Sequence, residues 1–168
     1  MLTVKQNVFI NKEIKSLYKS AFPKRERIPV IYLRLQKAFN KFHFNTYYDD
    51  NNFVGFIFYR EGTKYIFVNY FATKSECRNK GYGREILSLF LQEHSDKPIC
   101  LTIESPDGLS EDDIKVRRKN FYERNGFILH DFSASLRGIK YNFMSTKELT
   151  QEQAWTVIKA AAGLDYNE

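Results

Sequence analysis

A basic turn that contains two glycines is the part of this sequence whose residue types best suit chemistry. It reads Arg78-Asn79-Lys80-Gly81-Tyr82-Gly83-Arg84 and lies where a predicted strand gives way to a predicted helix. The first amides of a helix have no partner inside the helix and lie at the positive end of its dipole, so they attract anions. The glycines let an anion approach the backbone closely. The segment therefore predicts a site for a diphosphate.

Two common nucleotide-binding motifs are excluded by the same residues. No Lys-Ser/Thr pair follows the glycines, as a Walker loop requires, and the third glycine of the dinucleotide fingerprint is missing. A plainer interpretation stays open, in which residues 78–84 are only a helix start with two turn glycines and a solvated charged face.

The elements around this turn follow from hydrophobic spacing. Apolar residues three and four positions apart predict helices over residues 14–21, 31–39, 86–91 and 154–161. A further helix is predicted with Ser110 as its N-cap, Asp113 three residues on, and an end at Asn125-Gly126. Runs of aromatic and β-branched residues predict strands over residues 43–48, 52–59, 65–71, 99–103, 127–131 and 140–145.

These elements indicate a single domain over residues 1–168. Their order, α-α-β-β-β-α-β-α-β-β-α, is typical of an α/β (α+β) fold with a twisted, mixed, mostly antiparallel sheet flanked by helices. A chain of 168 residues is long enough to bury a core. Its contents of 43% hydrophobic and 16% aromatic residues exclude intrinsic disorder.

A membrane segment, a disulfide scaffold and a metal centre are not expected. No apolar run reaches about 18 residues, and the N-terminus lacks the features of a signal peptide, so we expect a cytoplasmic protein. Cys77 and Cys100 are too few for a disulfide scaffold. His43, His94 and His130 are scattered without the spacing of metal ligands.

The net charge of +6 matters less than its distribution. Basic residues gather over residues 74–84 and again over residues 115–124, and each of these two stretches contains a single acid, Glu76 and Glu123 respectively. Such clusters suit a phosphorylated small molecule or a nucleic acid. A basic module that binds RNA or DNA therefore stays open as an alternative, but no nucleic-acid signature is present and we expect no such partner.

Two motifs in order give the chain a family resemblance. Residues 78–83 match the pattern Arg/Gln-x-x-Gly-x-Gly/Ala, and residues 121–127 match Phe/Leu-Tyr-Glu-x-x-Gly-Phe. From about Phe53 to Met144 the chain resembles the GNAT superfamily of N-acetyltransferases. It departs from the family at Lys115 and Arg118, where many relatives carry Asn and Ala, and at Thr73, where valine is usual.

The resemblance implies an acetyl-CoA-dependent N-acetyltransferase that acts on a primary amine of a small molecule or peptide by direct attack in a ternary complex. Acetyl-CoA would be a co-substrate, with no metal. The implied contacts are the backbone of Phe71, Ala72 and Thr73 for the pantetheine arm, residues 78–84 for the diphosphate, and Arg118 for the 3′-phosphate. The enzyme would be a monomer or a homodimer. A GNAT fold that binds CoA without transfer activity is a further possibility.

The same resemblance assigns one catalytic role, and the chemistry of the transfer calls for a second. Tyr122 stands where the family places the acid that protonates the leaving thiolate; alternatively, it is a core residue with a hydrogen-bonded hydroxyl. The amine must lose a proton, and Glu104 at the end of a predicted strand is our candidate base. Its alternative is an ordinary acid that pairs with a nearby Arg. Glu26 either helps to bind a cationic acceptor or belongs to a solvated charged loop.

Overall fold

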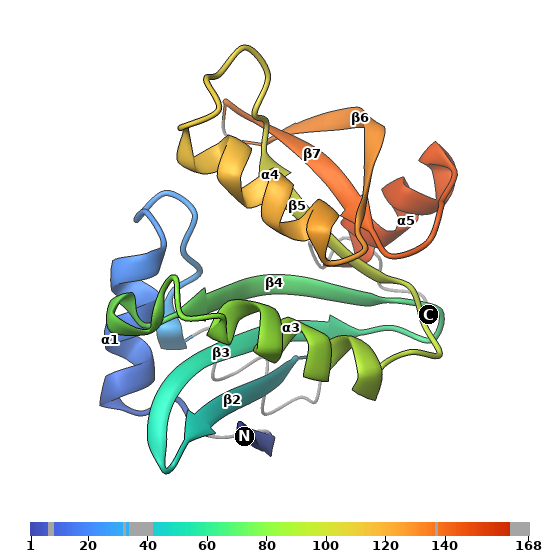
Figure 1. Cartoon of the computed structure of the whole chain (residues 1–168). Coiled ribbons are helices and arrows are strands. Elements are labelled where there is room, and N and C mark those ends of the chain that lie inside the picture. Colours follow the sequence, from blue (N-terminus) through green and yellow to red (C-terminus); the bar gives the residue numbers. More distant parts are fainter. Residues whose placement is uncertain (7–8, 32, 34–41, 137, 162–168) are drawn as a thin grey trace. The chain divides into compact units, whose positions relative to one another are not determined.

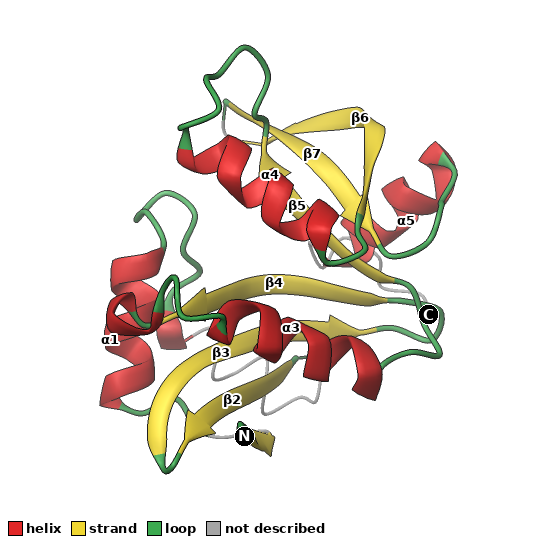
Figure 2. Cartoon of the chain, viewed as in Figure 1, coloured by secondary structure: helices red, strands yellow, loops and turns green. Residues whose placement is uncertain are grey.

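A computed structural model describes residues 1–6, 9–31, 33, 42–136 and 138–161 (Figures 1 and 2). The chain divides into two compact units, which are described one at a time. Unit 1 consists of Met1–Glu61 and Val68–Glu93, and unit 2 of Gly62–Phe67 and His94–Glu168.

Unit 1 is built on β1 (Thr3–Gln6), β2 (His43–Asp49), β3 (Asn52–Glu61) and most of β4 (Ile66–Thr73), hydrogen-bonded in that order. β1 with β2 and β2 with β3 are antiparallel pairs. The turn between β2 and β3 uses Asp50 and Asn51 with φ of 44° and 70°. Asp and Asn tolerate this left-handed backbone better than most residues, which explains the tight hairpin.

Helices α1 (Lys12–Ala21) and α3 (Tyr82–Glu93) cover opposite faces of the strands in unit 1. Successive side chains of a strand point to opposite faces. On β3, Phe56 and Phe58 belong to the same buried cluster as the apolar face of α1. Their neighbour Tyr59 points the other way and contacts Phe90 of α3, with ring centroids 4.9 Å apart. This alternation buries both faces of β3.

Unit 2 contains β5 (Ile99–Glu104), β6 (Ile128–Leu136), β7 (Ile139–Ser145), α4 (Ile114–Arg124) and α5 (Gln151–Ala161). β7 pairs antiparallel with both β5 and β6. The start of β4 pairs parallel with β5, at Ile66–Ile99 and Phe67–Cys100. The apolar face of α5, formed by Ala154, Val157 and Ala160, packs with Phe143 and other buried residues. The predicted fold class, a mixed and mostly antiparallel sheet with flanking helices, is confirmed.

The structure differs from the sequence-based predictions at the start of α4 and at β1, and most of one predicted helix lies outside the described residues. The N-cap of α4 is Asp113, whose Oδ1 accepts a hydrogen bond from the Lys115 amide at 2.8 Å, and not Ser110. The Asp113 amide donates to the Ser110 backbone carbonyl in a preceding turn. β1 was not predicted. The second predicted helix is seen only at Val30, Ile31 and Leu33; its other residues lie outside the described ones.

No helix within the described ranges is long and apolar enough to span a membrane.

Candidate functional site

The predicted diphosphate loop is a turn in which residues with left-handed backbone dihedrals alternate with residues with right-handed ones. β4 ends at Thr73, and a 3-10 helix, Ser75–Cys77, follows. Asn79 and Gly81 then have φ of 60° and 84°, and α3 begins at the next residue. Alternation of right- and left-handed residues turns successive amides to one side and is typical of anion-binding backbone nests.

The amides in the centre of this turn form no hydrogen bond of ordinary geometry within the described part of the chain. The last amides before it donate to backbone carbonyls, Cys77 to Lys74 and Arg78 to Ser75. The first helical amide with a partner is that of Glu85, which donates to the Gly81 carbonyl at 3.1 Å. Between them, no amide of residues 79–84 makes a hydrogen bond of ordinary geometry to any residue that the structure describes. A row of six consecutive amides is therefore available to a ligand.

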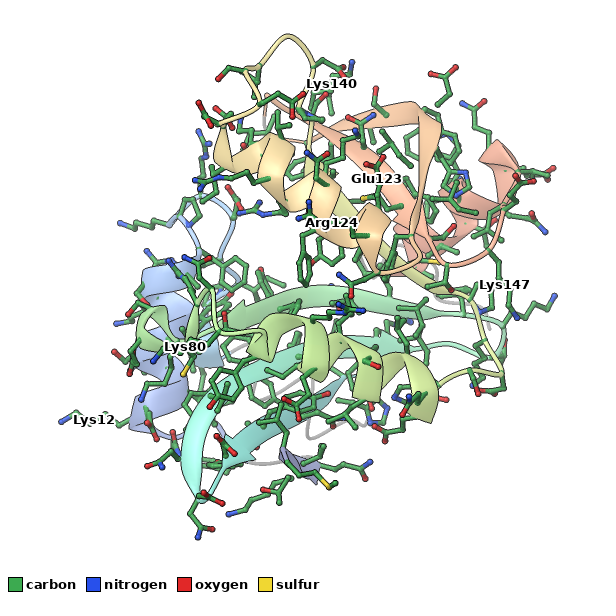
Figure 3. The ribbon with its side chains drawn as sticks, viewed as in Figure 1. Lys12, Lys80, Glu123, Arg124, Lys140 and Lys147 are labelled. Carbon is green, nitrogen blue, oxygen red and sulfur yellow. The ribbon has the colours of Figure 1, made fainter. Side chains whose placement is uncertain are left out.

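Positive charge surrounds these amides. The side chains of Arg78, Lys80 and Arg84 are exposed, and none forms an ion pair with another described residue. Figure 3 shows Lys80 on the turn that precedes α3. Lys74 differs, because its ammonium lies 2.9 Å from Glu76 and 3.3 Å from Glu13. The nearby Gly81 has open space where a Cβ would stand. The arrangement can bind a polyvalent anion.

Tyr122, in the last turn of α4, is buried, with 8% of its surface exposed. Its ring contacts those of Phe121 and Phe127, each with centroids 5.3 Å away. Burial raises the pKa of Tyr122 to about 12, against an opposing effect of the Arg118 charge. The hydroxyl makes no hydrogen bond to a residue in the described part of the chain. The burial of Tyr122 fits the interpretation as a core residue, and its protonated phenol fits the interpretation as an acid.

Glu104 is the last residue of β5 and is 7% exposed. Its Oε2 lies 2.6 Å from Nζ of Lys115, in the first turn of α4. The partner is a lysine rather than the arginine considered from the sequence, yet the ion pair is of the kind that the alternative interpretation describes. A neighbouring ammonium favours the charged carboxylate and opposes proton uptake.

The basic cluster on α4 is only partly neutralised. Lys119 pairs with Glu123 at 3.3 Å, one helical turn away, and Lys115 pairs with Glu104. Arg118 is half-buried and has no ion pair with a described residue. Figure 3 shows Arg124 close to the end of α4. The proposed contact of Arg118 with an anionic ligand group stays a prediction.

The loop that carries Glu26 is held to the core by two tyrosine hydroxyls. Tyr70 donates to the Glu26 carbonyl at 2.7 Å, and the Ile28 amide donates to Tyr18 at 2.8 Å and to Tyr70 at 3.2 Å. The Glu26 side chain is 15% exposed, so the solvated loop considered from the sequence does not describe it. Sequence reasoning missed these anchors because they join residues far apart in the chain.

The two cysteines and the possible metal ligands complete the list of side chains that could carry chemistry. Cys77 and Cys100 are free thiols, and burial raises the pKa of Cys100 to about 12. Over the described ranges, no three His, Cys, Asp or Glu side chains lie close enough together to hold a metal ion.

The predicted site residues thus fall into two sets. Residues 71–73 and 78–84 are brought together in unit 1, where the end of β4 leads directly into the turn. Glu104, Arg118 and Tyr122 belong to unit 2 and are described within it.

Comparison with known proteins agrees with these features. A family model described as an acetyltransferase (GNAT) domain matches residues 40–129, which include the turn and Tyr122. No curated protein sequence matches the chain. A solved structure from Bacteroides thetaiotaomicron, described as an acetyltransferase of the GNAT family, has 29% identity and a TM-score of 0.74, over 89% of this chain and 86% of that one.

Two other solved structures contain the coenzyme. An acetyltransferase from Bacillus subtilis in complex with CoA has 12% identity and a TM-score of 0.61, over 89% of this chain and all (100%) of that one. A GNAT acetyltransferase from Elizabethkingia anophelis with acetyl-CoA bound has 12% identity and a TM-score of 0.62, over 88% and 98%. At this identity the two show a shared fold. Since the family model covers more than half of the sequence, the chain belongs to the GNAT family of acetyltransferases.

Proposed function

We propose that this protein is an acetyl-CoA-dependent N-acetyltransferase that acetylates a primary amine of a small molecule or peptide. The observation that carries the proposal is the row of amides at residues 79–84, which the described protein leaves without partners beside exposed basic side chains. These amides and the dipole of α3 would bind the diphosphate of acetyl-CoA. Arg118 would bind the 3′-phosphate.

The backbone of Phe71, Ala72 and Thr73 would hydrogen-bond the pantetheine arm as an added strand would. These residues end β4, immediately before the turn, so one continuous segment of chain serves the arm and the diphosphate. An amide near Thr73 would also stabilise the oxyanion that forms as the amine attacks.

The transfer itself requires one bond to form and one to break. The amine nitrogen attacks the thioester carbonyl carbon, the C–S bond breaks, and the sulfur leaves as a thiolate. Tyr122 would donate its hydroxyl hydrogen to that sulfur. Because its pKa is about 12, it is protonated at pH 7. A thiol has a pKa of about 8.5, so a hydrogen bond from the phenol is more favourable than complete transfer of its proton.

The amine must lose a proton before or during the attack. We propose Glu104 as the acceptor of that proton, directly or through water. Its burial and its place at a strand end support the role, whereas its ion pair with Lys115 works against it. Glu104→Gln and Lys115→Met separate the two effects.

Thermal unfolding with and without acetyl-CoA tests the proposal. A ligand at 100 times its Kd stabilises the folded state by about 2.7 kcal/mol, which is a shift of several degrees for a domain of this size. Gly81→Val should abolish the shift, because a β-branched residue is strained at φ of 84° and will move the amides. Gly108→Val is the matched control, since Gly108 also has positive φ, 71°, and open space around it, but lies in unit 2.

Two results would contradict the proposal. One is the absence of any shift for the parent protein at millimolar acetyl-CoA, and the other is an equal loss of the shift in both glycine variants. A panel of amines, with release of CoA thiol as the readout, then tests the transfer. Binding without release for every amine would identify a CoA-binding protein without transfer activity.

A further inference from the structure

The diphosphate turn is held to unit 1 on both sides, while its centre is bare. Before it, Lys74 of the β4–α3 connection pairs with Glu13 of α1 at 3.3 Å. After it, the Tyr82 hydroxyl donates a hydrogen bond to Oδ2 of Asp49 at 2.6 Å. Residues 78–81 between these anchors are exposed.

The two anchors differ in strength. Glu13 is 51% exposed, and ion pairs between exposed side chains contribute little to stability. The bond between Tyr82 and Asp49 joins a phenol to a carboxylate whose side chain is 34% exposed, and it is short. Hydrogen bonds to a charged acceptor are about twice as strong as those between neutral groups. This bond also raises the pKa of Tyr82.

Asp49 is a firm point of attachment. It ends β2, pairs with Asn52 across the hairpin, and is followed by the two left-handed turn residues. Tyr82, by contrast, stands between Gly81 and Gly83, and glycine has more backbone freedom than any other residue. Without a tether the first turn of α3 would have to be ordered when the ligand binds, at the expense of affinity.

We propose that Asp49 is a positioning residue: through its hydrogen bond to Tyr82 it fixes the start of α3 on the β2–β3 hairpin, so that the amides of residues 79–84 are oriented before a diphosphate binds. The inference rests on the proposed role of the turn, and it concerns a residue that no motif identifies.

Three variants test the tether. Tyr82→Phe removes the donor and keeps the ring, and Asp49→Ala removes the acceptor. Asp49→Asn keeps an acceptor oxygen at the same place but removes its charge, so it should restore part of the parent behaviour. Asp112→Ala, at an exposed acid of unit 2, is the control for a simple loss of negative charge.

The first readout is the affinity for acetyl-CoA, which calorimetry measures. Loss of one such hydrogen bond predicts a rise in Kd of about tenfold for Tyr82→Phe and for Asp49→Ala. The double variant should be no weaker than either single one, because both remove the same bond. With acetyl-pantetheine, which lacks the diphosphate, kcat/KM should be the same for Asp49→Ala and the parent protein. A purely structural defect in Asp49→Ala would lower both the affinity for acetyl-CoA and kcat/KM with acetyl-pantetheine.

Hydrogen exchange of the free protein is the second readout and needs no ligand. The Glu85 amide, which donates to the Gly81 carbonyl and is the first hydrogen-bonded amide of α3, should exchange faster in Tyr82→Phe and Asp49→Ala than in the parent and in Asp49→Asn. Unchanged exchange together with unchanged affinity would overturn the tether. It would also be overturned if Asp49→Asn were as impaired as Asp49→Ala in both affinity and exchange. If the parent protein does not bind acetyl-CoA, the proposed function fails, while exchange still decides whether Asp49 orders the turn.

Discussion

The carboxylate of Glu104 and the ammonium of Lys115 lie 2.6 Å apart in unit 2, where β5 ends and α4 begins. Glu104 is buried, whereas the Lys115 side chain is 36% exposed. A base must accept a proton, and the nearby positive charge makes that harder. The pair therefore allows the proposed role of Glu104 to be tested from both of its members.

If Glu104 is the base, Glu104→Gln should remove the acid limb of the pH profile of kcat/KM and lower its plateau by about a hundredfold. Lys115→Met should keep activity and move the acid limb to higher pH, because the carboxylate loses its competing charge. Steady-state kinetics between pH 5 and 9 measure both effects. A Glu104→Gln enzyme that loses thermal stability but keeps the acid limb would make Glu104 a structural residue.

Removal of the Tyr122 hydroxyl should affect turnover and little else. We expect Tyr122→Phe to lower kcat about tenfold to a hundredfold, with the Kd of acetyl-CoA unchanged. Stability should not fall, because this hydroxyl has no hydrogen bond to a described residue. Tyr47→Phe, at a fully buried tyrosine of unit 1, is the control and should leave kcat unchanged. Equal effects of the two variants on kcat would remove Tyr122 from the mechanism.

The raised pKa of Tyr122 also predicts a pH dependence of stability. The folded-state pKa of about 12 exceeds the ordinary value of 10.0, so the folded state holds the proton more tightly than the unfolded one. This contribution is fully present below pH 10 and is lost as the pH rises towards 12. At pH 11 the loss is about 1 kcal/mol.

Denaturant unfolding of the parent protein and Tyr122→Phe, at pH 8 and again at pH 11, measures this loss. The comparison must be between the two proteins, because burial also raises the pKa of Tyr18, Tyr47 and Tyr59. Their effects cancel in the difference. A difference in unfolding free energy that stays constant from pH 8 to pH 11 would show that Tyr122 titrates normally.

Gly55 should tolerate no side chain. A Cβ at this position of β3 would lie 2.5 Å from the Ala72 carbonyl oxygen of β4, which is backbone and cannot move aside. We expect Gly55→Ala to lower the unfolding free energy by about 2–3 kcal/mol. Urea denaturation measures this difference. Gly62→Ala controls for loss of a glycine, because Gly62 has no positive φ and the atoms nearest to an added Cβ, at 3.1 and 3.2 Å, belong to the Tyr65 side chain. If Gly55→Ala is no less stable than the control, β3 and β4 do not approach so closely.

The sequence predicted the elements that have a strong local signal. The end of α4 was read correctly because Asn125 and Gly126 suit a helix C-terminus, and Gly126 indeed has φ of 86°. The start of α4 was misplaced because Ser110 and Asp113 are both good N-caps, and only the surrounding turn decides between them. β1 was missed because Thr3–Gln6 has no buried residue; pairing with β2 makes it a strand.

The candidate site also has features that the sequence could predict and features that it could not. Residues 78–84 form a contiguous motif, so the turn and its anion-binding character could be predicted. The contacts between Glu104 and Lys115 and between Asp49 and Tyr82 could not, since each depends on how separate elements pack. Asp49 in particular has only the signal of a hairpin turn, and nothing in the spacing connects it with Tyr82, 33 residues away.

The attachment of residues 26–28 to Tyr18 and Tyr70 has a consequence for how this protein can vary. Surface loops usually accept insertions and deletions, because their backbone is solvated. Here the backbone groups of Glu26 and Ile28 are fixed by hydroxyls that come from α1 and β4. One extra residue between Pro23 and Ile28 would put both out of reach. Related proteins should therefore preserve the length of this segment, while the exposed residue at position 24 can vary.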